Sequence, residues 1–268
     1  MIDLDYIIRV FREAQRREYD AGNAVSGYVG EGKSTFTIQL MKKYYKIGSL
    51  SEFKTMCNKY LVYSRKEIQK ITTTETKQFI NVDEAINVLF KRDFMKGDQK
   101  NLLRTLDVCR DMGHIFTFII PSFWALDSHT VQTRLRLWVH VEKQKWAHLS
   151  RPLRNQYSID VWHRTENEKI INKTKSVVNT LNYISTMGFN PLTPEEYEIY
   201  KEVKHAKRLK AQDEKDEKPE VSRSEIARLI HRVNKELSQE EIATTLGITR
   251  QGVQKALKLA RKQPTRLY

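Results

Sequence analysis

A glycine-rich loop near the N-terminus carries the residues best suited to chemistry. Residues 27–34 match the pattern G-x-x-x-x-G-K-[ST] at every fixed position. In this pattern the glycines let backbone N–H groups turn toward an anion, the lysine reaches the β- and γ-phosphates, and the hydroxyl binds Mg²⁺. We therefore expect a site for ATP and Mg²⁺, with Ser34 on the metal and Lys33 as a catalytic cation. The expected nucleotide-binding residues are Gly27, Gly30, Gly32, Lys33, Ser34 and Thr35.

The segments around the loop support this interpretation. Residues 24–29 are mostly apolar and predict a strand, and residues 33–45 predict a helix that follows the loop. Such a helix directs its positive N-terminal end toward the phosphates. The alternative is an accidental glycine-rich turn, which does not account for the strand and the helix on either side.

A second acidic element lies downstream. Residues 78–83 form a mostly apolar run that predicts a buried parallel strand, and the run ends in Asp83 followed by Glu84. In a phosphate-loop enzyme, Asp83 would hold Mg²⁺ through its water shell, and Glu84 would orient and deprotonate the attacking water. The alternative is a strand that leads into a helix with a charged first turn.

Composition limits the class of protein. The chain has 268 residues, 40% of them hydrophobic, and a formal net charge of +14. The positive charge favours a polyanionic partner, with nucleic acid first. No run approaches the roughly 20 apolar residues of a membrane span, and the N-terminus lacks a signal-peptide pattern. Two cysteines, without metal-ligand spacing, favour a reducing interior. We expect a cytoplasmic protein, in a cell or in the host of a virus or plasmid, without a membrane segment.

Alternating patterns predict an α/β fold with a mostly parallel sheet. Strands are expected at 24–29, 60–63, 78–83, 115–120 and 135–141, and helices at 4–19, 33–45, 50–58, 65–70, 84–92 and 99–112. The strand at 60–63 falls between the two nucleotide motifs along the chain. This resembles the RecA-like P-loop NTPases, in which an extra strand is inserted between the two strands that carry these motifs, and we expect 60–63 to be that strand. The predicted domains are an ATPase domain at 1–190, a charged helix and linker at 191–221, and a third domain at 222–268.

Two segments are less regular. Residues 143–154 are basic and predict a loop over the sheet edge, and residues 157–162 alternate like an edge strand. Residues 191–210 predict a charged helix entered through Pro194. Residues 210–219 have no apolar face and predict a solvated linker.

The last fifty residues predict a small all-α domain. Capping boxes begin at Ser222 and Ser238, and Gly247 interrupts the helical pattern. Residues 239–257 resemble the helix-turn-helix family, in which the third helix enters the major groove of duplex DNA. The resemblance implies that basic and amide side chains of this helix contact the DNA, namely Arg250, Gln251, Gln254, Lys255 and Lys258. The alternative is a three-helix module that binds protein.

The stretch from 115 to 141 refines the class of ATPase. The strand that ends at Pro121 is followed by Ser122, a small polar residue suited to sensing the γ-phosphate, and Thr133-Arg134 precedes the next strand. This arrangement is similar to the FtsK–HerA superfamily of DNA-translocating and DNA-packaging ATPases. The resemblance implies that Arg134, with Arg136 as second choice, reaches the neighbouring subunit's nucleotide.

The sequence thus leads to one main expectation and two alternatives. The main one is a DNA-stimulated ATPase that assembles into a ring, with a hexamer favoured, and translocates or packages duplex DNA. The second is an ATP-switched DNA-binding regulator of replication, transposition or transcription. The third is a module that acts on RNA or on a protein complex.

Overall fold

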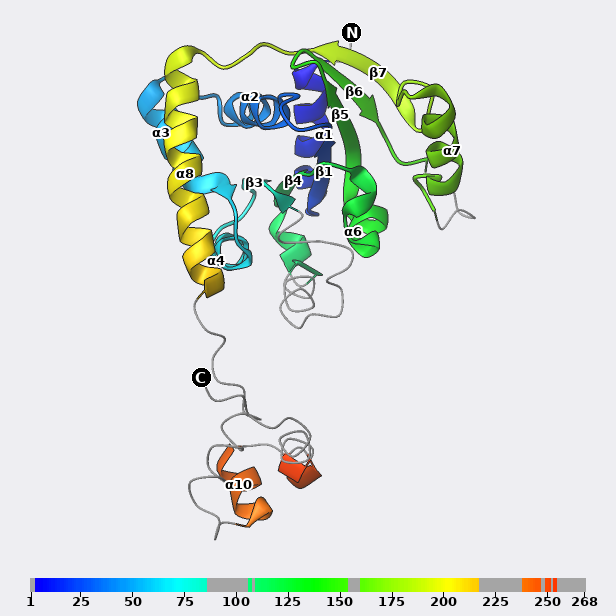
Figure 1. Cartoon of the computed structure of the whole chain (residues 1–268). Coiled ribbons are helices and arrows are strands. Elements are labelled where there is room, and N and C mark those ends of the chain that lie inside the picture. The colour runs from blue at the N-terminus through cyan, green and yellow to red at the C-terminus, as the bar shows by residue number, and fades with distance from the viewer. Residues whose placement is uncertain are drawn as a thin grey trace, which may run out of the picture. The chain divides into compact units, whose positions relative to one another are not determined.

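The computed structural model (Figure 1) describes residues 3–85, 106–107, 109–153, 160–216, 238–246, 249–251 and 253–254. The chain divides into two compact units, Met1–Ala211 and Gln212–Tyr268. The first unit holds the sheet and both nucleotide motifs. No helix in the described part of the chain is long and apolar enough to cross a membrane.

A seven-stranded sheet organises the first unit. Its order is β2-β3-β4-β1-β5-β6-β7; β2 to β5 pair in parallel, and β6 and β7 are antiparallel to their neighbours. The strands are β1 (Ala21–Ser26), β2 (Leu61–Val62), β3 (Phe79–Val82), β4 (Ile115–Ile119), β5 (Leu135–Glu142), β6 (Trp146–Ser150) and β7 (Tyr183–Gly188). The predicted α/β class with a mostly parallel sheet is confirmed.

Helices cover both faces of this sheet (Figure 1). One core cluster includes residues of α1 (Leu4–Arg16), α2 (Lys33–Tyr45), α3 (Leu50–Tyr60) and α8 (Pro194–Asp216). The other includes residues of α4 (Arg65–Thr74), α6 (Ser128–Thr133), α7 (Arg164–Thr174) and the short turn η4 (Phe123–Ala125). Side chains alternate between the two faces along a strand, so Val25 joins the first cluster and Ala24 the second.

The strand between the two nucleotide motifs is β4. It pairs in register with β1 on one side, Asn23 opposite Thr117, and with β3 on the other, Asn81 opposite Thr117. The prediction that the 60–63 strand separates the motifs is wrong. That segment forms only the two-residue β2, which pairs with β3 at the sheet edge. Sequence order places a strand between two motifs along the chain but does not set its place in the sheet.

Several other observed elements differ from the predicted ones, most of them in the segment that follows β5. Residues 143–154 were expected to form a loop, yet they contain β6, whose alternating side chains pair with β5 and β7. Helix α7 and strand β7 were not predicted. Residues 160–162 form no strand, and the rest of the strand expected at 157–162 lies outside the described residues. The helix expected at 84–92, and most of that expected at 99–112, also lie outside them; residues 109–112 form the short turn η3.

Helix α8 belongs to the first unit for most of its length. Tyr200 and Val203 are 5% and 3% exposed and join the core cluster that holds α2 and α3. The domain boundary predicted at 190 is therefore misplaced, because the apolar face of α8 packs on the core of the first unit. The helix continues to Asp216, past the boundary at Ala211, where the sequence predicted a linker.

The second unit retains one of the predicted capping boxes. In it α10 (Gln239–Leu246) begins after Ser238, whose hydroxyl accepts from the Glu241 N–H at 3.2 Å, while the Glu241 carboxylate accepts from the Ser238 N–H at 2.7 Å. Ile242, Ala243 and Val253 are buried, as expected for a small helical core. The helix expected at Ser222 lies outside the described residues, and the helix-turn-helix assignment stays a prediction.

Candidate nucleotide site

The glycine-rich loop connects β1 to α2, and its glycines have conformations that other residues avoid. Gly27 has φ of 147°, and a Cβ there would run into the carbonyl oxygen of Val141 on β5. Gly30 and Gly32 have φ of 85° and 87°. Since L-residues with side chains rarely adopt these angles, the glycines of the pattern are required by the backbone path.

The N-terminus of α2 is arranged to receive an anion. Gly32 is its N-cap and offers no side-chain hydrogen bond, whereas α3 and α4 begin with complete capping boxes from Ser49 and Ser64. The first-turn N–H groups of α2 therefore lack the side-chain acceptor that closes the other two helices. Together with the helix dipole, they favour a phosphate at this position.

Lys33 bends back over its own loop. Its ammonium donates to the carbonyl oxygens of Gly27 at 2.7 Å and Tyr28 at 2.6 Å. Burial lowers the pKa of Lys33, and the negative charges of Asp83 and Glu31 oppose that shift. The ammonium thus lies at the loop, where the pattern requires a cation.

The turn between β5 and β6 supports the loop from the side. The Glu31 carboxylate accepts from the N–H of Lys143, and the Gln144 amide donates to the Gly30 carbonyl at 2.6 Å. Lys143 and Gln144 have φ of 53° and 52°, the pair of positive angles found in type I′ hairpin turns. Sequence reasoning missed this support, although the polar residues 142–145 between two apolar runs were a signal for a hairpin.

Asp83 and Glu84 follow β3 and reach the same edge of the sheet as the loop. Asp83 is 2% exposed, and its Oδ1 accepts from the N–H of Glu84 at 3.1 Å. Glu84 has φ of 55°, an angle that is unusual outside glycine and common at functional positions. The structure therefore brings together the two motifs that lie fifty residues apart in the sequence.

A buried polar chain fixes α2 relative to β3. The Asn81 amide donates to the Thr37 hydroxyl at 3.0 Å, and that hydroxyl donates to the Ser34 carbonyl at 3.0 Å. Both side chains are fully buried, where a hydrogen bond is costly to lose. These two hydrogen bonds fix the start of α2 relative to β3, the strand that leads to Asp83 and Glu84.

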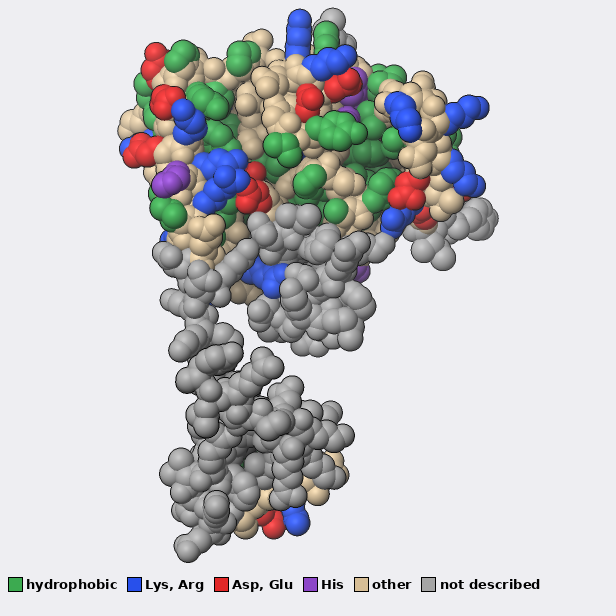
Figure 2. All heavy atoms as spheres, in the orientation of Figure 1, with side chains coloured by type: hydrophobic (Ala, Val, Ile, Leu, Met, Phe, Trp, Pro, Cys, Tyr) green, Lys and Arg blue, Asp and Glu red, His purple; other side chains and the backbone are tan. Residues whose placement is uncertain are grey.

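Helix α8 packs against the acidic pair. The Oδ2 atom of Asp83 accepts from the Lys204 ammonium at 2.8 Å, from the Tyr63 hydroxyl at 2.6 Å and from the Tyr200 hydroxyl at 3.3 Å. Arg208, one turn beyond Lys204, forms an ion pair with Glu84. Figure 2 shows basic side chains next to acidic ones beside α8.

Sequence reasoning missed the contribution of α8. Tyr200, Lys204 and Arg208 recur at every fourth position, so they lie on one stripe of the helix, and this spacing was the available signal. Burial raises the pKa of Tyr200 to about 12. Burial also lowers the pKa of Lys204, but Asp83 and Tyr200 outweigh it and leave that pKa above its ordinary value.

The arrangement fits a magnesium ion together with phosphate. The Tyr200 hydroxyl donates to Asp83 Oδ2 and lines the same cavity as Ser34, so the two predicted metal-binding residues lie near one group. The described residues contain no cluster of three or more histidine, cysteine or carboxylate side chains that would hold a metal alone. A metal here would take Ser34, Asp83 and phosphate oxygens, which is the usual Mg²⁺ environment in such sites.

The site contains a cavity of about 480 Å³, within the range of small-molecule pockets. The start of α2, the β5–β6 turn and α8 all contribute to its lining. The lining residues include Lys33, Ser34, Thr35, Gln144, Tyr197, Tyr200 and Lys204.

Ser122 follows β4 and lies at this same edge. It lines a second cavity, of about 710 Å³, on the other side of the loop, together with Gly27 and His140. There the Ser26 hydroxyl accepts from the Trp138 indole at 2.7 Å and pairs with His140 Nδ1 at 3.0 Å. The position of Ser122 next to the loop agrees with the predicted sensor, whose role stays a prediction.

Arg134 lies at the opposite edge of the sheet, and the expectation that it reaches a neighbouring nucleotide is wrong. It precedes β5, and the pairing of Gly22 with Leu135 places it beside the start of β1, whereas the phosphate loop follows the end of β1. Its side chain is 4% exposed and forms ion pairs with Asp20 and Asp107. Arg136, the second choice, packs over the Tyr19 ring near the same edge, 4.7 Å from its centroid.

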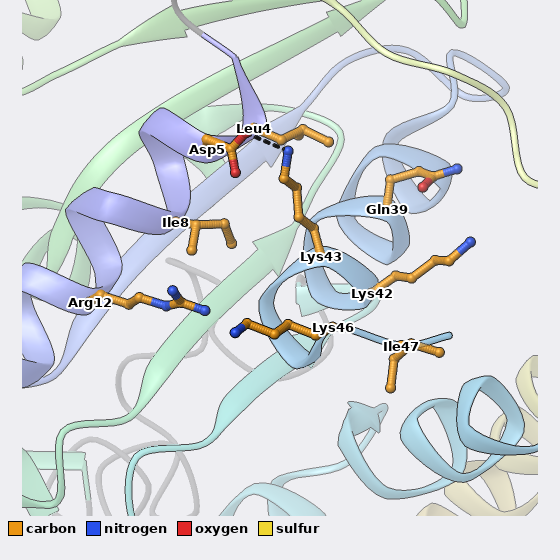
Figure 3. A pocket seen from close by; sticks show the side chains of 9 residues that line it. All are labelled: Leu4, Asp5, Ile8, Arg12, Gln39, Lys42, Lys43, Lys46 and Ile47. Atoms are coloured by element: carbon orange, nitrogen blue, oxygen red, sulfur yellow. Dashed lines mark hydrogen bonds and ion pairs between the residues drawn. The ribbon is translucent and has the colours of Figure 1, made fainter. Parts of the chain in front are cut away.

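A basic groove lies between α1 and the C-terminal half of α2 (Figure 3). Its volume is about 460 Å³, and Arg12 and Lys46 point toward one another across it, while Leu4, Ile8 and Ile47 supply apolar lining. Lys43 pairs with Asp5 across it at 2.6 Å. Because the phosphate loop precedes the other end of α2, this groove is separate from the nucleotide site.

The predicted DNA-contacting residues are only partly described. Arg250, Gln251 and Gln254 are exposed, while Val253 between them is buried. Lys255 and Lys258 lie outside the described residues. The exposed positions are free of core packing, and their contact with DNA stays a prediction.

Comparison with known proteins adds little to this site. No protein-family model and no curated protein matches the sequence. Among solved structures, the chain is similar to the crystal structure of the N-terminal domain of zonular occludens toxin from Neisseria meningitidis. The identity is 15% and the TM-score 0.38, over 68% of this chain and 99% of that one. The interpretation of the site therefore depends on this chain's own residues.

Proposed function

We propose that this protein binds ATP with Mg²⁺, hydrolyses it, and uses the cycle to act on DNA. The observation that supports ATP hydrolysis is the convergence of the phosphate loop and the Asp83–Glu84 pair at one edge of the sheet. Strand β4 separates the two strands that carry them. Lys33 and Ser34 line a cavity of suitable size together with Tyr200 and Lys204 of α8, and both of these α8 residues contact Asp83.

The proposed reaction is an in-line displacement. The oxygen of a water molecule bonds to the γ-phosphorus, the bond from that phosphorus to the β–γ bridging oxygen breaks, and ADP leaves with the bridging oxygen. Glu84 accepts the water proton, and Lys33 balances charge on the phosphate oxygens. Mg²⁺, when held by Ser34 and Asp83, would neutralise further charge on those oxygens. Glu84 must exchange its ion pair with Arg208 for contact with the water.

Nucleotide binding and phosphate release by the full chain test this proposal. Lys33→Ala should abolish productive ATP binding, because the loop loses its cation. Glu84→Gln should bind ATP with nearly wild-type affinity and release phosphate at least a hundredfold more slowly, since the amide cannot accept the proton. A wild-type chain without affinity for labelled ATP in Mg²⁺ would rule out the proposal, and normal turnover by Glu84→Gln would reassign the base.

DNA is the proposed partner because of the net charge of +14 and the helix-turn-helix resemblance of the second unit. A ring motor, most simply a hexamer in the cytoplasm of a cell or of a viral or plasmid host, is the form that the FtsK–HerA resemblance implies. That form now lacks its proposed trans arginine, since the Arg134 side chain is buried and paired with Asp20 and Asp107 of its own chain. Stimulation of turnover by duplex DNA, together with a hexamer mass in ATP analogue, would support the motor.

An ATP-switched DNA-binding regulator is the second candidate, and one observation favours it. Lys204 and Arg208 of α8 bind both acidic residues of the site, and the same helix continues past Ala211 into the second unit. A bound nucleotide that alters these ion pairs would act on the segment that leads to the DNA-binding residues. Nucleotide-dependent DNA affinity without DNA-stimulated turnover would support this form.

A further inference from the structure

Lys204 is a cation in the candidate nucleotide cavity that the phosphate-loop pattern does not account for. Its side chain is 22% exposed, and its ammonium lies 2.8 Å from Asp83 Oδ2 and 2.9 Å from the Tyr200 hydroxyl. Lys204 and Lys33 are the two cations among the described residues that line this cavity. A cation at this position therefore needs an explanation beyond the phosphate-loop pattern.

The backbone that carries Lys204 is firmly held. Tyr200 and Val203 are buried in the core, Glu196 pairs with Lys42 of α2, and Lys207 pairs with Glu67 of α4 at 2.9 Å. The helix is thus anchored on both sides of Lys204. Movement of the ammonium then comes from its four-carbon stem, which is flexible enough to change partners while the helix stays in place.

The charge of the ligand supports a second cation. A nucleoside triphosphate carries about four negative charges near neutral pH, and enzymes of this class surround them with several positive groups. Arg134, the residue expected to supply one, lies at the other edge of the sheet. Lys204 already lines the same cavity as Lys33.

We propose that Lys204 is a further nucleotide-binding residue, which holds Asp83 in the arrangement described above and exchanges it for the terminal phosphate of a bound triphosphate. The inference rests on the proposed ATP binding. Asp83 would keep its hydrogen bonds from Tyr63, Tyr200 and the Glu84 N–H after the exchange. The oxygen that Lys204 releases is the one suited to the water shell of Mg²⁺.

Binding of fluorescent ATP and ADP analogues to the full chain, in Mg²⁺ and in excess EDTA, tests the proposal. Lys204→Gln keeps an N–H donor for Asp83 and removes the charge. We expect its affinity for ATP to fall about tenfold, the size of one charge-assisted hydrogen bond, and its affinity for ADP to stay the same. Lys201→Gln is the matched control, since it removes an exposed cation one turn away that pairs only within α8 and does not line the cavity, and it should alter neither affinity.

The ratio of ATP to ADP affinity decides the outcome. Equal losses for both nucleotides would mean that Lys204 only shapes the cavity, and no loss would mean that it does not contact the ligand; either result overturns the proposal while wild-type ATP binding stands. Failure of the wild type to bind either nucleotide would instead remove the proposed function. If Lys204→Gln melts early, Lys204→Arg serves in its place: it should keep the wild-type ratio, and an intact arginine variant that loses the ratio would also overturn the proposal.

Discussion

The buried ion pair of Arg134 offers a sharp test, because its two interpretations predict different measurements. As a residue that completes a neighbouring site, Arg134 would affect turnover and leave folding alone. The structure instead places its guanidinium, 4% exposed, against the carboxylate of Asp20, 5% exposed, with Asp107 as a second partner. Burial lowers the pKa of Arg134 to about 10, which reflects the cost of removing the cation from water. We therefore expect Arg134→Ala to act on stability.

The size of the stability loss follows from the carboxylate that remains after Arg134 is removed. Without Arg134, Asp20 keeps a buried charge without its cation, and breaking a buried pair in this way costs about 3–5 kcal/mol. For a chain of this size each kcal/mol lowers the melting temperature by roughly 2–4 °C, so a fall of about 6–20 °C is expected. The strand between Arg134 and the phosphate loop spans roughly 20 Å, so ATP affinity well below the melting temperature should be unchanged.

Thermal and urea unfolding of Arg134→Ala, Asp20→Ala and the double variant measure this effect. The double variant should be less destabilised than the sum of the two single variants, because neither charge is left alone. Arg134→Met should recover part of the loss by filling the volume. A wild-type melting temperature in Arg134→Ala, combined with lost turnover only in the assembled protein, would refute the structural role and restore the trans assignment.

Two further predictions concern the residues beside the loop. Burial, aided by the nearby His148, lowers the pKa of His140 to about 4 from an unfolded value near 6.5. As the pH falls, the unfolded chain therefore binds the proton before the folded one does. Stability present above pH 6.5 should be lost as the pH falls toward 4, by at most about 3 kcal/mol. In urea unfolding, the stability of His140→Asn should depend less on pH than that of the wild type, and an identical pH dependence would contradict the lowered pKa of His140. Gly27→Ala should weaken ATP binding more than tenfold and destabilise the fold by about 2 kcal/mol, because its Cβ meets the Val141 carbonyl at a strained φ. Gly48→Ala is its control, since a Cβ at Gly48 meets only Glu52 at 3.9 Å, and equal effects at the two positions would count against a specific role of Gly27.

Several features of the site were predictable because they depend on neighbours in the sequence. The loop pattern places glycine at backbone angles that other residues avoid, as Gly30 and Gly32 show. Helix α2 begins and ends where its pattern predicted, from Lys33 to Tyr45. Asp83 follows a short apolar strand, and parallel strands end at one edge, so its meeting with the loop was implied. The capping box at Ser238 is likewise a contact over three residues.

The surroundings of Arg134 are a feature that local sequence patterns do not predict. It precedes its strand, whereas the phosphate loop follows its own, and parallel neighbours therefore hold the two at opposite edges. The predicted parallel sheet already implied that geometry. The assignment of Arg134 to a neighbouring nucleotide depended instead on the resemblance to the FtsK–HerA superfamily. The burial of Arg134 against Asp20 depends on a contact across 114 residues, which no local pattern contains.

The amino-acid sequence alone was enough to predict a glycine-rich loop between a strand and a helix, an acidic strand end and an α/β frame, because each arises from short-range conformational preference and periodicity. Folding was needed to place β4 between the motifs, to bring the β5–β6 turn against the loop and to pack α8 against Asp83 and Glu84. These outcomes depend on which apolar faces bury one another, and here the burial of Tyr200 and Val203 brings Lys204 to a site more than a hundred residues away along the chain.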